Sequence, residues 1–201
     1  MIHPIRLYGD PCLRRRARPV TEFDEALAAL ADDMIETMLD ANGSGLAAPQ
    51  IGVERRLFVM SGFANGYPDP DAPPSPDEER AAAEVIVNPE LTLRHGTHHA
   101  VEGCLSLPDL VHEAVPRSST LHLRYQDLQG AHHQRPVRGR EAVVVQHEYD
   151  HLDGVLFIDR LDEGERLAFM DEHRAELAQF QREAKAFLKD LRGTPARRRR
   201  R

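Results

Sequence analysis

The residues with the clearest chemical signature lie together in the pentapeptide His147-Glu148-Tyr149-Asp150-His151. On an α-helix, residues four apart lie on the same face, so both imidazoles can bind one metal ion while Glu148 flanks it. The alternative is an exposed helix that carries these residues by chance, but the valines just before His147 favour a buried helix. The pentapeptide therefore predicts a metal site with an adjacent carboxylate that transfers protons.

A catalytic ion of this kind usually takes three protein ligands and leaves one position for water. A third histidine after the motif is missing, because Phe157 stands at its place. Glu163 and Glu165 follow too closely to come from a separate helix, which disfavours a glutamate ligand. Cys104 lies in a turn-forming segment, and its thiolate would complete a tetrahedral set with the two histidines. The alternative for Cys104 is an ordinary buried free cysteine.

The spacing of apolar residues predicts the elements that position these groups. A helix over residues 142–152 carries the histidines, and a second helix over residues 22–41 is capped by Thr21. The glycines of residues 43–50 predict a loop. Short strands are expected at residues 57–60, 85–87, 91–93 and 121–125. The sequence thus predicts an α+β fold, in which antiparallel sheets pack around the helix with the His-Glu-x-x-His motif.

The remaining segments are peripheral. Residues 62–80 are rich in proline and predict a surface insertion. An apolar stripe on a charged segment predicts a long C-terminal helix over residues 162–192. Residues 193–201, which end in an uninterrupted arginine run, predict a disordered basic tail. We therefore expect one catalytic domain over residues 1–192, followed by the tail.

Composition limits the class of protein. The 201 residues suit one domain, and 41% hydrophobic and 29% charged residues argue against a largely disordered chain. No apolar run approaches the roughly 20 residues that cross a bilayer, and Met1 is not followed by an apolar signal core. The two cysteines, Cys12 and Cys104, do not form a disulfide framework. We expect a cytoplasmic protein with no membrane association.

Three separated segments together resemble the peptide deformylase family. They are Gly43-Ser-Gly-Leu-Ala-Ala-Pro-Gln50, Glu102-Gly-Cys-Leu-Ser106 and Gln146-His-Glu-Tyr-Asp-His-Leu152, in the order and separation typical of the family. The resemblance extends over nearly everything up to about residue 161. It implies an enzyme that removes the formyl group from the N-terminal formylmethionine of nascent polypeptides and releases formate.

The resemblance also implies roles for individual residues. Cys104, His147 and His151 would hold one divalent ion, with iron(II) favoured and zinc or nickel expected after handling in air. Water at the ion, assisted by Glu148, would attack the formyl carbon, and Glu148 would then protonate the leaving amine. The Gln50 side-chain amide and the Leu105 backbone N–H would meet the developing oxyanion.

The substrate-binding residues expected on the same grounds are Gly45 and Gly103, with Val143 and Val144 lining a methionine pocket. Each of these has a structural alternative: Gly45 can permit positive φ, and the valines can be ordinary core. Gln50 can likewise cap a turn. Glu102 is expected to pair with an arginine such as Arg117, and Gln146 to support the site.

Other functions remain open from the sequence. The His-Glu-x-x-His helix also suits a metallopeptidase, against which Phe157 and Cys104 argue. A catalytically silent deformylase-like binding protein would be expected to have lost a ligand, Glu148 or Gln50, and a third alternative uses Cys104 as a nucleophile. Ser44 and Arg140 depart from the family by replacing residues that are usually apolar. The C-terminal helix and the arginine tail suggest docking to the ribosome, where the substrates emerge.

Overall fold

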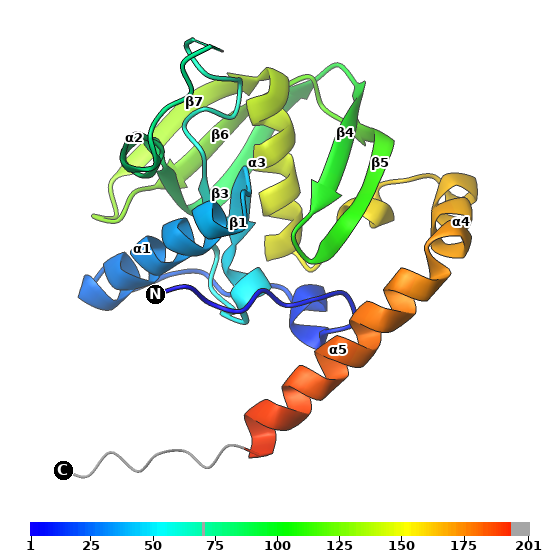
Figure 1. Ribbon diagram of the computed structural model, residues 1–201. Helices are drawn as coiled ribbons and strands as arrows, with labels where there is room; N and C mark the ends of the chain where they lie inside the picture. Colours follow the sequence, from blue (N-terminus) through cyan, green and yellow to red (C-terminus); the bar gives the residue numbers. More distant parts are fainter. Residues whose placement is uncertain (70, 194–201) are drawn as a thin grey trace, which may run out of the picture.

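The computed structural model describes residues 1–69 and 71–193, and it places helix α3 (Gly139–Leu152) between two antiparallel sheets (Figure 1). The larger sheet has five strands in the order β1-β2-β3-β6-β7, and the smaller sheet is the hairpin β4-β5. The strands are β1 (Gly45–Ala47), β2 (Leu57–Met60), β3 (Glu84–His95), β4 (His98–Cys104), β5 (Leu107–Arg117), β6 (Thr120–Gln126) and β7 (His132–Arg138). This architecture confirms the predicted α+β class, with antiparallel sheets around the motif-bearing helix.

Helix α3 is buried over most of its length because both sheets pack against it (Figure 1). Ala142 and Val145 belong to one apolar cluster with Phe58 of β2 and Leu121 of β6. The valines of residues 143–145 would equally suit a strand, but they lie on a helix that is buried between two sheets and therefore requires apolar residues on more than one face. The helix begins at Gly139, three residues earlier than predicted.

The predicted loop over residues 43–50 is wrong from residue 45 onward. Residues 45–47 form β1, whose backbone pairs with β2, and the chain continues into the 3-10 helix η2 (Ala48–Ile51). All three β1 residues are buried, so the strand shows no alternation of apolar and polar side chains. A strand this short takes its conformation from its partner, and its own residues give little signal.

The two strands predicted on either side of Asn88-Pro89 are halves of one long strand, β3. Asn88 has a positive φ of 49°, and the register with β6 shifts between Val87 and Glu90. The Asn88 side chain holds this irregularity in place, because it accepts a hydrogen bond from the Val20 N–H and donates one to the Val20 carbonyl. The sequence signal that suggested a strand end therefore marks a bulge.

Helix α1 (Glu25–Asp40) lies within the predicted range of residues 22–41, but its cap is Asp24 and not Thr21. The Asp24 carboxylate accepts a hydrogen bond from the Leu27 N–H at 2.9 Å, as an N-cap residue does. Leu27, Met34 and Met38 form the buried face and pack against the larger sheet.

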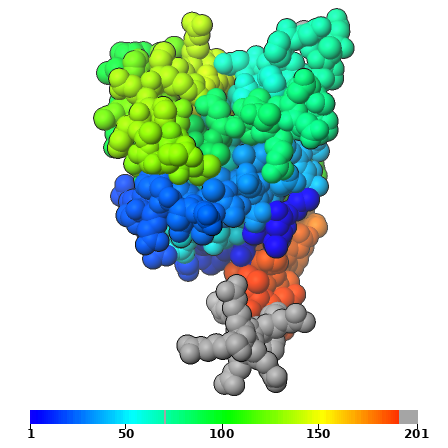
Figure 2. All heavy atoms as spheres, turned by 90° about the vertical axis from the view of Figure 1, so that its left-hand side faces the viewer, coloured from blue at the N-terminus to red at the C-terminus, as the bar shows by residue number. Residues whose placement is uncertain are grey.

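The proline-rich segment over residues 62–80 is at the surface and contains the start of a short helix, α2 (Pro76–Ala82), which has no buried residue. Ser75 and Glu78 cap this helix reciprocally. In Figure 2 the turquoise atoms of this part of the chain project at the upper right of the molecule.

The expected C-terminal helix is present as two consecutive helices, α4 (Glu163–Glu172) and α5 (Arg174–Gly193), which meet at His173. The apolar stripe of α5 is covered by the N-terminal segment: the Arg6 guanidinium lies 4.3 Å from the Phe187 ring centre, and Phe180 packs with Leu7. The expected tail over residues 193–201 lies outside the described residues except for Gly193. No helix within residues 1–69 and 71–193 has the length and apolar character to cross a membrane.

Candidate active site

Three side chains from two elements converge between the sheets. Cys104 is the last residue of β4, directly before the turn to β5, and His147 and His151 lie one helical turn apart on α3. The Cys104 Sγ and His151 Nε2 atoms are 3.2 Å apart, and the ligand atoms of all three residues lie within 4.8 Å of one another. In the described part of the chain, this is the one cluster of histidine, cysteine or acidic groups that can hold a metal ion.

The geometry of this cluster fits a divalent ion. Tetrahedral coordination by one sulfur and two ring nitrogens at usual bond lengths places neighbouring ligand atoms about 3.3 to 3.6 Å apart. The observed separation of Cys104 and His151 is close to this value. Burial lowers the pKa of His151 well below its ordinary value, so the ring is neutral, as a metal ligand must be.

His147 is oriented by a buried carboxylate. Its Nδ1 atom lies 2.8 Å from Glu102 Oε2, so Nε2 is the ring nitrogen that remains available to bind a metal ion. Carboxylates orient histidine ligands in this way in many metal sites. Glu102 and Cys104 lie two residues apart on β4 and point to the same buried side of the strand. This alternation in Glu102-Gly-Cys104 was a signal for the contact with His147 that sequence reasoning missed.

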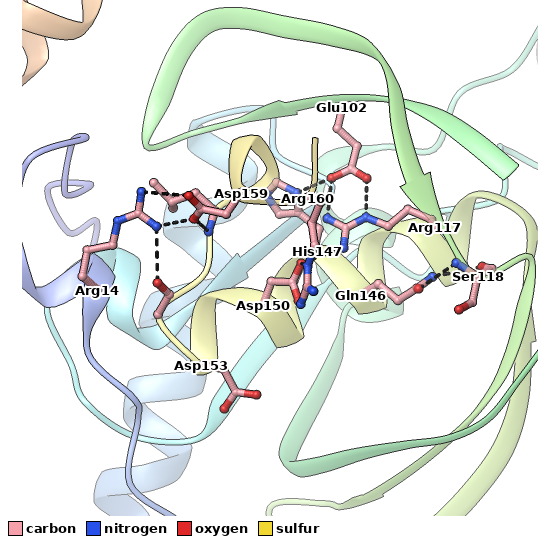
Figure 3. A network of polar contacts seen from close by, with 12 residues as sticks. Arg14, Glu102, Arg117, Ser118, Gln146, His147, Asp150, Asp153, Asp159 and Arg160 are labelled. Atoms are coloured by element: carbon pink, nitrogen blue, oxygen red, sulfur yellow. Dashed lines mark hydrogen bonds and ion pairs between the residues drawn. The ribbon is translucent and has the colours of Figure 1, made fainter. Parts of the chain in front are cut away.

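Glu102 belongs to a chain of ion pairs that is buried from Glu102 to Asp150 and reaches the surface at Arg160 (Figure 3). Arg117 donates from Nε to Glu102 Oε1 at 2.6 Å and from Nη1 to Asp150 Oδ2 at 2.6 Å. Arg160 in turn donates from Nε to Asp150 Oδ2 at 2.9 Å. The expected pair between Glu102 and Arg117 is confirmed, and its extension to Asp150 ties β4 and β5 to α3 on the side of the site away from β1.

Glu102 is ionised in this network. Burial alone would raise its pKa, but hydrogen bonds from Arg117 and His147 outweigh burial and lower the pKa to about 2. Gln146 adds a neutral connection between the same elements (Figure 3). Its side chain accepts from the Ser118 N–H at 2.9 Å and donates to the Ser118 carbonyl at 3.1 Å, as expected for a supporting residue.

Glu148 has the opposite environment. Its carboxylate is buried, Oε2 has no hydrogen-bond partner among the described residues, and burial raises its pKa to about 7. A carboxyl group with a pKa near neutrality can both accept and return a proton. Gly45 makes room for it, since a Cβ at residue 45 would lie 2.5 Å from Glu148 Oε1. Gly45 is not among the residues with positive φ, so close approach and not backbone geometry requires a glycine there.

The Gln50 side chain lies beside Cys104. Its Oε1 accepts a hydrogen bond from the Ala47 N–H at 2.8 Å, which caps η2 and fixes the amide group. Its Nε2 then lies 3.7 Å from Cys104 Sγ and 3.3 Å from Ser106 Oγ. The turn-capping alternative is therefore correct for the oxygen, while the nitrogen is directed at the cluster of ligand atoms. Leu105 is the turn residue that follows Cys104.

One cavity of about 610 Å³ connects these groups. Among the residues predicted to function, all but His151 line it: Gly45, Gln50, Gly103, Cys104, Leu105, Val143, Val144, His147 and Glu148. Ile5, Leu7 and Leu110 also line it but carried no signal in the sequence, because they are apolar residues of segments far apart in the chain. Arg140, noted only as a departure from the family pattern, lies on the same wall as the valines.

A buried thiol and two imidazoles beside an acidic group, open to a cavity, define a metal-dependent hydrolase. The family model for polypeptide deformylases matches residues 2–167. The chain is 49% identical over 197 residues to the peptide deformylase of Thermus thermophilus. The aligned region covers 95% of this chain and 98% of that protein. The chain belongs to the polypeptide deformylase family.

Solved structures agree with this assignment. The crystal structure of peptide deformylase from Thermus thermophilus matches with a TM-score of 0.80 and 46% identity, over 91% of this chain and 99% of that one. A Met-Ala-Ser-bound class I type b peptide deformylase from Acinetobacter baumannii matches with a TM-score of 0.69 and 35% identity, over 80% and 99%. The chain is thus a metal-dependent enzyme that removes the formyl group from N-terminal formylmethionine, and the metallopeptidase and silent-protein alternatives are set aside.

Proposed function

We propose that Cys104, His147 and His151 hold one catalytic divalent metal ion. The observation that carries this proposal is the convergence of their ligand atoms within 4.8 Å beside the cavity. When bound, the ion supplies Lewis acidity and lowers the pKa of water toward about 7. Thiolate and imidazole ligands suit both zinc and iron(II). We assign iron(II) on the family resemblance, with zinc or nickel as substitutes in purified protein.

Glu148 is the proton-transferring group in this proposal. Its carboxylate takes a proton from the attacking water and delivers it to the nitrogen of the leaving methionine amine, as its pKa of about 7 permits. Gln50 Nε2 and the Leu105 backbone N–H donate to the formyl oxygen as negative charge develops on it. The hydrogen bond between Gln50 Oε1 and Ala47 supports this role because it turns Nε2 toward Cys104.

The substrate lies along the cavity wall formed by Gly45 and Gly103, and its methionine side chain packs against Val143 and Val144. These valines lie one turn before His147 on the same face of α3, which places an apolar surface beside the reacting centre. The Acinetobacter baumannii relative was solved with Met-Ala-Ser, a peptide that begins with methionine.

The test is formate release from a formyl-methionyl peptide by protein reconstituted anaerobically with iron(II) or with zinc. We expect the iron(II) form of the wild type to be the faster one and Glu148→Ala to lose about 10²- to 10⁴-fold in kcat. Glu141→Ala is a matched control, because Glu141 is also on α3 but pairs with Arg135 outside the cavity. Equal turnover by wild type and Glu148→Ala would remove Glu148 from its role, and equal turnover with both metals would remove the preference for iron(II).

We also propose that residues 1–192 act as one catalytic domain in the cytoplasm, where nascent chains emerge from ribosomes, and that α5 contributes to docking there. The exposed side of α5 carries the basic residues Arg182, Lys185 and Lys189, which suits contact with RNA phosphates. The arginines of residues 197–201 would extend this surface, although they lie outside the described residues. Cosedimentation with ribosomes at increasing salt should weaken when residues 197–201 are removed; unchanged binding would exclude the tail.

A further inference from the structure

Arg140 is a charged residue in the wall of an otherwise largely apolar part of the cavity. It lies in the first turn of α3, is exposed, and lines the cavity together with Val143 and Val144. Its Nη1 donates to the Val101 carbonyl of β4 at 2.7 Å, which holds the guanidinium across the gap between α3 and β4. Within residues 1–69 and 71–193 it forms no ion pair, so its charge is not neutralised by a neighbouring carboxylate.

The distance of Arg140 from the proposed metal ligands can be derived from both α3 and β4, the two elements that it joins. On α3, Arg140 precedes His147 by seven residues on the same face, about 10 Å along the helix axis. On β4, Val101 precedes Cys104 by three residues, again about 10 Å. The guanidinium therefore lies at the outer end of the cavity, beyond the valines as seen from the metal ligands.

An extended peptide would bring a particular residue to this place. Side chains alternate along an extended chain, so the third residue faces the same side as the N-terminal methionine, about 7 Å farther from the formyl group. If methionine packs against Val143 and Val144, the third side chain points at the next turn of α3, which carries Arg140. We propose that Arg140 determines specificity at the third residue of the substrate, where it favours aspartate or glutamate. This inference rests on the proposed position of the methionine side chain.

The other charged groups nearby leave this role open to the substrate. Glu141 is paired with Arg135, and Glu102 is buried and paired with Arg117. Asp109, on the β5 side of the cavity, is the exposed acidic residue that shares the cavity with Arg140. No ion pair joins Asp109 to Arg140 among the described residues, so the guanidinium is left to the substrate, and its exposure to solvent keeps the expected preference modest.

The experiment compares kcat/KM for formate release from C-terminally amidated peptides, formyl-Met-Ala-Xaa-amide, in which Xaa is Glu, Gln or Lys. We expect the wild type to prefer Glu to Gln by about two- to five-fold, the range of a solvent-exposed ion pair, and the preference to shrink as salt is added. Arg140→Gln should abolish the preference, Arg140→Lys should keep most of it, and Arg140→Glu should favour Lys. Wild type that treats Glu and Gln alike would overturn the proposal.

Two controls separate position from general charge. Arg138→Gln removes the same charge two residues away, outside the cavity lining, and should leave the preference intact. A peptide with glutamate at the second residue, formyl-Met-Glu-Ala-amide, has the same net charge as formyl-Met-Ala-Glu-amide and should not share its advantage. If Arg138→Gln lowered the preference as much as Arg140→Gln, or if both peptides gained equally, the assignment to Arg140 and the third residue would be wrong. All variants should still release formate from the Gln peptide; loss of this activity would instead count against the proposed position of the substrate.

Discussion

Glu102 and Glu148 are both buried and both adjoin His147, yet their pKa values are shifted in opposite directions. The hydrogen bonds of Arg117 and His147 lower the pKa of Glu102 to about 2 against the effect of burial, whereas burial raises the pKa of Glu148 to about 7. Burial is common to both, so the difference comes from the partners that each carboxylate has.

The two sides of the site are built accordingly. The side formed by β4 and β5 supplies a charged network that orients His147 and keeps Glu102 ionised. On the side formed by β1, Gly45 has no side chain, so the Glu148 carboxylate can lie against its backbone without contacting a positively charged group there. In the proposed mechanism, His147 must stay fixed as a metal ligand while Glu148 must accept and release a proton, and the two groups therefore need different surroundings. Substitutions on each side of the site, and one outside it, therefore test whether stability and activity depend on different residues.

The largest effect is expected from Arg117→Met, which leaves Glu102 and Asp150 without their shared buried partner. Removing one member of a buried ion pair typically costs about 3 to 5 kcal/mol in the free energy of unfolding. Arg124→Met is the matched control, because Arg124 pairs with Glu90 at 3.3 Å on an exposed surface and should cost at most about 1 kcal/mol. Urea unfolding of the metal-free proteins measures both. Similar losses for the two variants would show that the Arg117 network is not a special stabilising feature.

The next effect is a dependence of stability on pH that Glu102 should produce. Its pKa is about 2 in the folded protein against 4.5 as its ordinary value, so its contribution is fully present above pH 4.5 and is lost as the pH falls toward 2. A shift of this size corresponds to about 3 kcal/mol. Wild type should therefore lose stability more steeply than Glu102→Gln between pH 4.5 and pH 2, as measured by urea unfolding without metal. Parallel curves would mean that Glu102 is not held ionised by Arg117 and His147.

Gly45→Ala should damage activity while sparing the fold. The added Cβ would displace the Glu148 carboxylate, and a displacement of about 1 Å at a catalytic group can cost roughly 100-fold in kcat. A double-mutant cycle on formate release identifies the cause, because Gly45→Ala should have little further effect on kcat in a Glu148→Ala background. An equal loss in both backgrounds would assign Gly45 to substrate pairing alone.

Local features of the site could be predicted from the sequence, whereas contacts between distant segments could not. The His147 to His151 spacing is a local property of a helix, and the three motifs together predicted that Cys104 would join it. Gln50 and Gly45 were found through the resemblance, but the contact between Gly45 and Glu148 was not, because it joins β1 to α3 across the core. Non-local contacts of this kind leave no periodic pattern in the sequence.

The strands show the same limit. Leu57 to Met60 were correctly predicted as a strand, whereas β4, β5 and β7 were not assigned, since β7 is rich in histidine and arginine and the hairpin includes prolines. Pairing with a neighbouring strand sets their conformation: β4 and β5 pair with each other from His98 opposite Arg117 to Cys104 opposite Leu107, and β7 pairs with β6. Helix α1 was predicted to within three residues because its apolar face repeats over several turns, and its cap was misplaced because Thr21 and Asp24 are both good capping residues.

The smallest effect is expected outside the site, at the proline-rich segment. Ser75→Ala removes the cap of α2, whose Ser75 Oγ and N–H both contact the Glu78 carboxylate, and should cost about 1 kcal/mol or less because the helix has no buried residue. Formate release should be unchanged, since the cavity contains no residue of this segment. Thermal unfolding and kcat/KM measured on the same preparations test both parts. A clear drop in activity would show that the conformation of this segment affects the position of Glu148 or of the metal ligands, and that the site depends on residues outside the cavity lining.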